Sequence, residues 1–253
     1  MKVIGMIPAR LGSTRVKNKN LRILDDKPLI QHIVDAAINS ELIDEIYINS
    51  ESNQFKSIAE NSDINFYLRP EHLSTDTATN DEFSLDFINN IECDILVQLL
   101  PTSPFVTSSE IDDFIQAMLD EDHHTMISVA NVQIESIFEG NAINFDTTKP
   151  TPPSQLLEPI KSYACSLMAW NTNTFRSNIE RYNAAYHGGV DKKGYFLLKG
   201  YSTIDIDNEE DFLLAEAVAS ALKSKVAKPK YYNADNEYTS EVDVPSILAK
   251  DGV

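Results

Sequence analysis

The first seventy residues alternate short apolar runs with amphipathic segments, and this alternation leaves the chain few folds to choose from. The runs at 3–7, 45–49 and 64–68 have the length and composition of strands. The segment that begins at Pro28 has the i, i+3, i+4, i+7 spacing of a helix, and residues 52–61 read as a second helix. A β-α-β-α-β order predicts a doubly wound sheet of parallel strands with helices on its faces.

The rest of the chain continues this pattern with one interruption. It predicts strands at 94–100, 125–130, 166–170 and 195–198, and helices at 80–90, 108–119, 172–182 and from Asn208 onward. From about 132 to 162 two proline clusters and no helical spacing predict an excursion, either a subunit contact or a plain surface loop. We expect one α/β domain over residues 1–226 and a C-terminal tail of uncertain structure over 227–253.

Charge is distributed unevenly along the chain. The net charge of −18 argues against general nucleic-acid binding and against anionic membranes. Residues 1–27, however, hold seven of the 21 Lys and Arg and only two of the 39 acids. A local cationic site on a negative protein suits a small anionic ligand, accompanied by a divalent metal.

Two observations bear on location. Cys93 and Cys165 have no metal-ligand spacing and suggest reduced thiols. No apolar run approaches the roughly 20 residues needed to span a bilayer. We therefore expect a cytoplasmic protein with no membrane partner.

A cationic loop directly follows the first predicted strand. It contains Arg10, Arg15, Lys17 and Lys19 together with the small residues 12 and 13. Small residues let backbone N–H groups approach phosphates, and cations neutralise them, so the loop predicts a polyphosphate site at the carboxyl edge of the sheet. It matches neither the P-loop nor the G-x-G-x-x-G pattern. The plainer alternative is a solvated basic loop.

Two carboxylates, Asp205 and Asp207, come before the last helix. In a strand they would share a face and could both bind one Mg²⁺. The alternative is a strand end followed by a helix cap, which Asp207 could provide without metal. Arg69 follows the third predicted strand and so lies at the same edge as the cationic loop. It is either a triphosphate contact or an ordinary surface arginine.

The motif Ile7-Pro-Ala-Arg10-x-Gly12-Ser13-x-Arg15-x-x-x-Lys19-Asn20 resembles the fingerprint of the cytidylyltransferases that activate sialic acids and related keto-sugar acids as CMP-sugars. Further matches follow in order over residues 1–222: Lys27-Pro-Leu-Ile30, Arg69-Pro70, Asp76-Thr77, Pro101-Thr-Ser-Pro104, and Asp205-Ile-Asp207 with Asp211.

The resemblance implies a Rossmann-like, mostly parallel sheet flanked by helices, CTP and Mg²⁺ as requirements, and a homodimer closed by the excursion. Its catalytic residues would be Arg10, Lys19 and Asp207. Its metal ligands would be Asp205 and Asp207. The family's nucleotide contacts fall on Arg10, Gly12, Ser13, Arg15, Lys19, Asn20, Arg69, Ala78 and Asn80, and its acceptor contacts on Leu100, Thr102 and Ser166. The sugar hydroxyl would attack the α-phosphorus and expel pyrophosphate.

The departures from the family pattern fall on the acceptor side. Leu100 stands where sialic-acid enzymes have Gln, and Ser166-Leu167 replaces an Asn-Gly pair. The acceptor is therefore sialic acid, another nonulosonic acid, or an acidic non-sugar such as a phosphonate. Two other readings are a metal-dependent glycosyltransferase and a nucleotide-binding module without turnover. Five intact residues count against the module without turnover: Arg10, Arg15, Lys19, Asp205 and Asp207.

Overall fold

The computed structural model describes residues 1–12 and 15–224, and the tail predicted for 227–253 lies outside them. The predicted alternation of strands and helices is confirmed. The strands are β1 (Val3–Pro8), β2 (Ile23–Leu24), β3 (Lys27–Pro28), β4 (Glu45–Ser50), β5 (Asn65–Leu68), β6 (Ile95–Leu99), β7 (Thr125–Val132), β8 (Ile137–Phe138), β9 (Asn141–Ala142), β10 (Ile160–Asn171) and β11 (Lys193–Leu197). The α-helices are α1 (Leu29–Ile38), α2 (Asn53–Asn61), α3 (Asn80–Asn90), α4 (Ser108–Asp120), α5 (Thr172–Tyr182) and α6 (Glu209–Lys223). Short 3₁₀ turns lie at Lys19–Leu21, Glu71–Ser74, Ser154–Leu156 and Gly200–Thr203.

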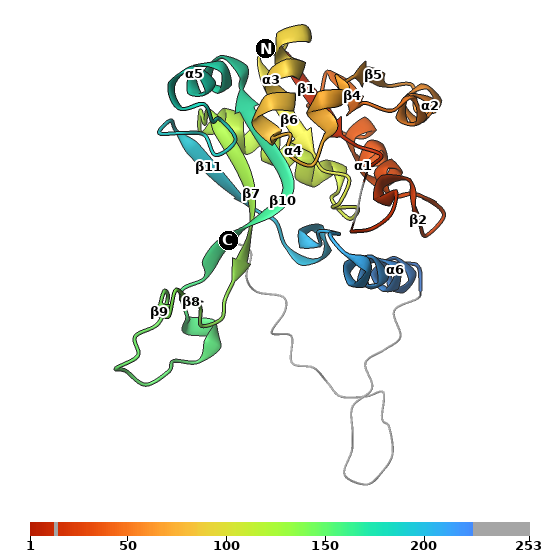
Figure 1. Ribbon diagram of the computed structural model, residues 1–253. Coiled ribbons are helices and arrows are strands. Elements are labelled where there is room, and N and C mark those ends of the chain that lie inside the picture. Colours follow the sequence, from red (N-terminus) through yellow and green to blue (C-terminus); the bar gives the residue numbers. More distant parts are fainter. Residues whose placement is uncertain (13–14, 225–253) are drawn as a thin grey trace.

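Seven strands form the central sheet in the order β11-β7-β10-β6-β1-β4-β5 (Figure 1). Every pairing is parallel except those of β10, which runs antiparallel to both β6 and β7. The mostly parallel sheet of the prediction is confirmed. The carboxyl ends of β1, β4 and β6 therefore meet at one edge, where the segments after them can share a site.

Side chains alternate across the sheet into two cores. On one face Val3 and Ile7 pack with apolar residues of α1, α2 and α4, and on the other Ile4 and Met6 pack with those of α3 and α5. A third core joins Val16, Leu24 and Leu29 to Ile206 and residues of α6. This third core brings the segment before α6 against the cationic loop.

Polar side chains cap the helices. Ser52 caps α2, and Thr79 and Asn208 form capping boxes at α3 and α6. At α4 the cap is Thr107, the residue directly before the first helical turn. Thr107 accepts from the Glu110 amide and closes a capping box, because only a residue before the first helical turn can reach its third amide.

The excursion predicted at 132–162 is narrower than expected, because β7 continues to Val132 and β10 begins at Ile160. These two strands pair out to Ile160↔Val132 and carry between them residues 133–159, the arm. The arm contains the β8–β9 hairpin and projects from the body in Figure 1. Among the described residues, no helix has the length and apolar character required for a membrane crossing.

Candidate active site

A cavity of about 280 Å³ opens at the edge where β1 and β6 end. Its lining includes seven of the residues singled out from sequence, namely Arg10, Arg15, Lys19, Asn20, Arg69, Leu100 and Thr102. Pro8, Ala9, Phe83 and Pro101 complete the lining. The structure thus brings both loops, after the first strand and after β6, around one space.

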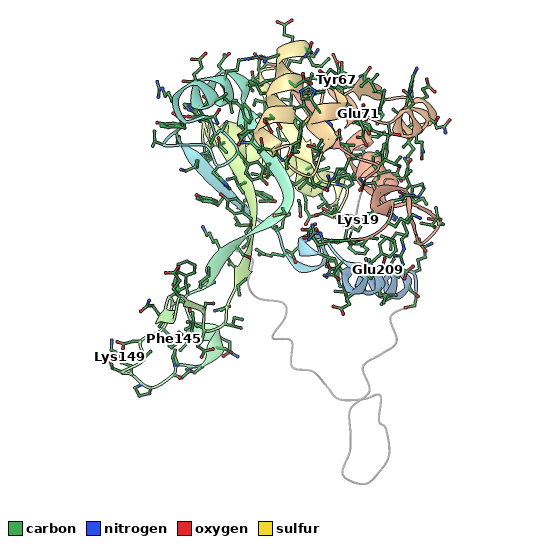
Figure 2. All side chains as sticks on the ribbon, viewed as in Figure 1. Lys19, Tyr67, Glu71, Phe145, Lys149 and Glu209 are labelled. Atoms are coloured by element: carbon green, nitrogen blue, oxygen red, sulfur yellow. The ribbon has the colours of Figure 1, made fainter. Side chains whose placement is uncertain are left out.

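Asp207 pairs with two of the loop cations from almost two hundred residues away. Its Oδ1 lies 2.9 Å from Arg15 Nη2 and 3.5 Å from Lys19 Nζ. The Lys19 ammonium also donates to the backbone carbonyl of Ile206. Burial lowers the pKa of Lys19, an effect that Asp207 and Asp205 oppose. Two cations that line the cavity, Arg15 and Lys19, are therefore held by one carboxylate outside its lining. Figure 2 labels Lys19.

Arg10 has a carboxylate partner of its own. Its Nη1 lies 2.7 Å from Asp76 Oδ1, in the segment between β5 and α3. Both side chains are solvent-exposed, so this pair is weak and readily exchanged. An incoming phosphate could replace Asp76 as the partner of Arg10 at little cost.

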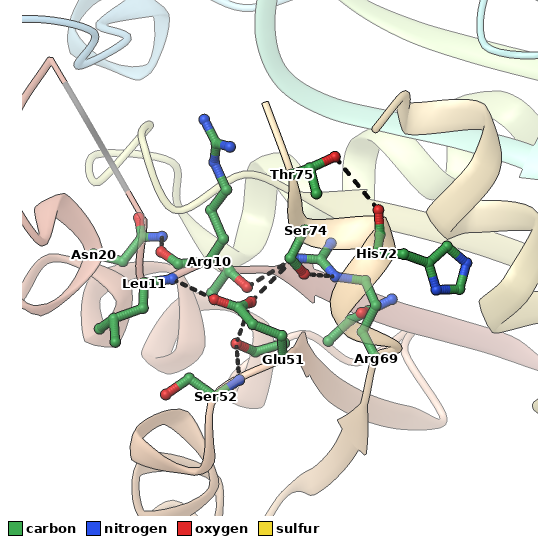
Figure 3. Close-up of polar contacts among 12 residues, drawn as sticks. Arg10, Leu11, Asn20, Glu51, Ser52, Arg69, His72, Ser74 and Thr75 are labelled. Atoms are coloured by element: carbon green, nitrogen blue, oxygen red, sulfur yellow. Dashed lines mark hydrogen bonds and ion pairs between the residues drawn. The ribbon is translucent and has the colours of Figure 1, made fainter. Parts of the chain in front are cut away.

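Arg69 is buried, which excludes the surface-arginine alternative. Its Nε donates to Ser74 Oγ at 2.9 Å, its Nη2 to the Ala9 carbonyl at 3.1 Å, and its guanidinium lies 4.9 Å from the centre of the Phe83 ring. Burial lowers the pKa of Arg69, while the Glu51 carboxylate raises it. Arg69 thus lines the cavity while its Nε and Nη2 atoms are bonded to protein groups (Figure 3).

Asp205 and Asp207 do not lie in a strand, and that prediction is wrong. Among residues 1–12 and 15–224, one backbone bond, from the Ile206 amide to the Thr102 carbonyl at 2.9 Å, ties this segment to the loop after β6. The Asp205 Oδ1 atom is buried and has no hydrogen-bond partner among the described residues. Burial raises the pKa of Asp205, a rise that Thr102 opposes and Asp207 increases. A buried, unpartnered carboxylate oxygen beside a second carboxylate fits a divalent cation.

Two acids alone make a small donor set. Within residues 1–12 and 15–224 no group of three or more His, Cys, Asp and Glu side chains is arranged to hold a metal. Oxygens from water and phosphate complete Mg²⁺ coordination at many nucleotide sites.

The other predicted nucleotide contacts are placed less directly. The Asn20 amide donates to the Arg10 carbonyl at 3.4 Å, and Gly12 faces open space. Asn80 exchanges hydrogen bonds with Gln98 at 2.8 and 3.2 Å and, like Ala78, is not among the residues lining the cavity. Ser13 lies outside the described residues.

The sequence model of the cytidylyltransferase family matches residues 4–151, more than half of the chain. The chain belongs to the cytidylyltransferase family. It is 29% identical to the N-acylneuraminate cytidylyltransferase of Escherichia coli O18:K1:H7 over 98% of this chain and 59% of that one. It is 30% identical to that of Streptococcus agalactiae serotype V over 84% of this chain and 52% of that one. The chain thus spans only about half to three fifths of the length of these two curated relatives.

A solved structure supports the fold. CMP:2-keto-3-deoxy-manno-octonic acid synthetase, complexed with CTP, superposes with a TM-score of 0.67 at 14% identity, covering 88% of this chain and all of that one. Together with the mixed sheet described above, this likeness confirms the Rossmann-like α/β fold.

The structure separates the three residues that were predicted to contact the acceptor. Leu100 and Thr102 line the cavity, but Ser166 is fully buried and its hydroxyl donates to the Ala164 and Ser202 carbonyls. The structure therefore does not bring the Ser166 side chain to the cavity. Its carbonyl instead accepts from the Leu100 amide at 3.0 Å, so Ser166 holds the backbone of the loop that lines it.

Sequence reasoning missed Glu51. It directly follows β4, and one of its oxygens accepts from the Leu11 amide at 2.8 Å while the other lies 3.6 Å from Arg69 Nη2. Burial raises the pKa of this carboxyl, but the Leu11 amide, Ser74 and Arg69 together hold it below its usual range. Its position after a parallel strand was the available signal, since the same rule identified Arg10 and Arg69.

Proposed function

We propose that this protein transfers CMP from CTP to the hydroxyl of an acidic keto-sugar, sialic acid or another nonulosonic acid, and releases pyrophosphate. The observation that carries this proposal is the cavity in which Arg10, Arg15 and Lys19 converge beside Asp205 and Asp207. Membership of the cytidylyltransferase family supports it.

The chemistry assigns a task to each side of the cavity. Arg10, Arg15 and Lys19 bind the triphosphate and stabilise the charge that develops on the leaving pyrophosphate. Asp205 and Asp207 hold Mg²⁺, which when bound neutralises phosphate charge and favours ionisation of the attacking hydroxyl. Arg15 and Lys19 exchange Asp207 for phosphate as the nucleotide enters. The acceptor oxygen forms a bond to the α-phosphorus as the bond to the β-phosphate oxygen breaks.

We propose that Asn20 and the 78–80 segment recognise cytidine, and that Leu100 and Thr102 face the acceptor. Leu100 offers no hydrogen bond from its side chain, which favours an acceptor whose corresponding group is apolar. A phosphonate or another acidic non-sugar is the alternative acceptor, supported by this same replacement of Gln by Leu.

We further propose a homodimer formed through the arm. Its side chains Ile134, Ile137, Phe138 and Leu156 are 61–75% exposed, an unusual density of large apolar groups for a free surface. The free Cys93 and Cys165 fit a reducing compartment, which supports a cytoplasmic location.

Pyrophosphate release is the test of this function. The protein is incubated with CTP, Mg²⁺ and a panel of nonulosonic acids, with phosphonates as a second panel and UTP as the nucleotide control. We expect release with CTP and at least one keto-sugar acid. Release with a phosphonate alone would overturn the sugar assignment, and CTP binding without release from any acceptor would favour the binding-module reading.

A further inference from the structure

Side chains from two other strands hold the peptide groups on both sides of Arg10. Before it, the Ala9 carbonyl accepts from Arg69 Nη2 at 3.1 Å. After it, the Leu11 amide donates to Glu51 Oε1 at 2.8 Å. Figure 3 shows Leu11, Glu51 and Arg69 gathered around the backbone of Arg10, and Glu51 and Arg69 directly follow β4 and β5. The backbone of Arg10 is therefore fixed by residues distant in sequence.

These contacts replace the strand ladder where it ends. The Ala9 amide makes the last bond to the neighbouring strand, donating to the Asn49 carbonyl at 3.0 Å. Beyond that point the chain turns into the cationic loop. A buried backbone group without a partner costs about as much as a lost hydrogen bond, so side chains must supply the partners. Glu51 and Arg69 supply two of them.

Glu51 and Arg69 also support each other. Their side chains are 17% and 3% exposed, and Arg69 Nη2 lies 3.6 Å from Glu51 Oε2. Arg69 lines the cavity, whereas Glu51 does not. Glu51 therefore reaches the site only through the backbone and through Arg69. If the loop were mobile, ordering Arg10 around a ligand would cost conformational entropy and weaken binding. A loop that is already fixed avoids this cost.

We propose that Glu51 is a positioning residue which, with Arg69, fixes the backbone around Arg10 and so aims its guanidinium at the triphosphate. This inference rests on the proposed function. It assigns Glu51 no contact with CTP and no part in the chemical step. Its substitution should weaken nucleotide binding and leave the acceptor KM unchanged.

Two substitutions of Glu51 separate its contacts. We expect Glu51→Ala to weaken CTP binding, measured by calorimetry, between about 10-fold and about 100-fold, the range for a lost charged hydrogen bond. Glu51→Gln keeps an oxygen for the Leu11 amide and should recover most of that loss. Glu45→Ala is the matched control, because Glu45 lies at the start of β4, the strand that Glu51 follows. Its carboxylate lies 2.6 Å from Lys2 Nζ, and neither residue lines the cavity.

A double-mutant cycle tests whether Glu51 acts through Arg10. In the Arg10→Ala background, adding Glu51→Ala should weaken CTP binding less than 2-fold further, within the usual error of independent effects. Full additivity of the two losses would overturn the proposal. So would a Glu51→Ala protein that binds CTP like the wild type.

Hydrogen exchange gives a readout that does not depend on CTP. The peptide containing residues 9–12 should exchange faster in Glu51→Ala than in the wild type, and at the wild-type rate in Glu45→Ala. If Glu51→Ala exchanges faster but the wild type does not bind CTP, the proposed function is overturned and the role of Glu51 in fixing the backbone is supported. Unchanged exchange would overturn the positioning role itself.

Discussion

The surfaces of the cavity and of the arm differ in chemical character: the first is lined by paired charges and the second exposes apolar side chains. In the cavity wall every described cation has a protein partner, as Arg10 has Asp76 and Arg15 has Asp207. On the arm, by contrast, Ile137 and Phe138 are about two-thirds exposed. Figure 2 shows the arm residues Phe145 and Lys149 projecting away from the body that holds Lys19.

This difference separates two kinds of binding. The carboxylate partners neutralise the cations of the cavity when no ligand is bound. A small anion that carries its own metal can replace these carboxylates as the partner of the cations. Exposed apolar side chains lower the free energy only when they are removed from water by packing against another surface. This contrast supports our proposals that the cavity binds a nucleotide and that the arm binds a second copy of the chain. Four substitutions test that division.

The largest effect should come from Arg10→Ala in the cavity. We expect kcat/KM to fall at least about 100-fold, as when one group that stabilises transition-state charge is removed. The fold should survive, because the Arg10 side chain pairs only with exposed Asp76 among the described residues. Steady-state pyrophosphate release measures the loss. Lys17→Ala, a change to an exposed cation of the same loop, is the control. Near-normal turnover of the Arg10 variant would refute the phosphate assignment.

Asp207→Asn should shift the metal requirement. We expect half-maximal activity to need at least about 10-fold more Mg²⁺, because one carboxylate ligand is lost. A Mg²⁺ titration of turnover measures the shift, with Glu210→Gln in the first turn of α6 as the control. An unchanged titration would return Asp207 to a role in pairing Arg15 and Lys19.

Phe138→Ser tests the arm. We expect the dimer Kd to rise about 10-fold or more, because large buried side chains dominate the free energy of association. Light scattering across a concentration series measures it. Leu213→Ser on α6 removes an equally exposed apolar side chain outside the arm and should leave the Kd unchanged. A wild-type protein that is monomeric throughout would contradict the dimer.

The smallest effect should be a gain in stability. Asp205 has a buried oxygen with no partner in the described part of the chain, so Asp205→Asn should raise the Tm of the ligand-free protein by about 2–4 °C, equivalent to about 1 kcal/mol in a chain of this size. Calorimetry measures it. Asp207→Asn should give no such gain, because Asp207 is already paired with Arg15 and Lys19. A fall in Tm for the Asp205 variant would show that its carboxylate has a stabilising partner.

The fold followed from the sequence where local periodicity carries the information. Apolar runs such as 94–100 identify buried strands, but period alone does not give direction, so the antiparallel course of β10 was unpredicted. The expected strand through Asp205 fails for a related reason. The backbone bond from Ile206 to Thr102 that holds this segment is a tertiary contact that no local pattern encodes.

Some residues of the candidate site could be predicted from the sequence and others could not. Arg10 and Lys19 could be found because they follow a strand and stand out against an acidic chain. Glu51 follows a strand as well, but as one acid among 39 it does not stand out by its charge, so its position was the only signal. The burial of Ser166 depends on packing against residues 36 positions away and could not be predicted.

The single tryptophan of the chain makes much of this measurable without a label. Trp170 is 1% exposed, its indole N–H donates to the Tyr186 carbonyl at 3.1 Å, and its ring meets that of Phe175 edge-on. A fully buried indole emits at shorter wavelengths than a hydrated one. The tryptophan fluorescence therefore reports one site in the core, and its red shift on unfolding would compare the stability of all the variants above on a common optical scale.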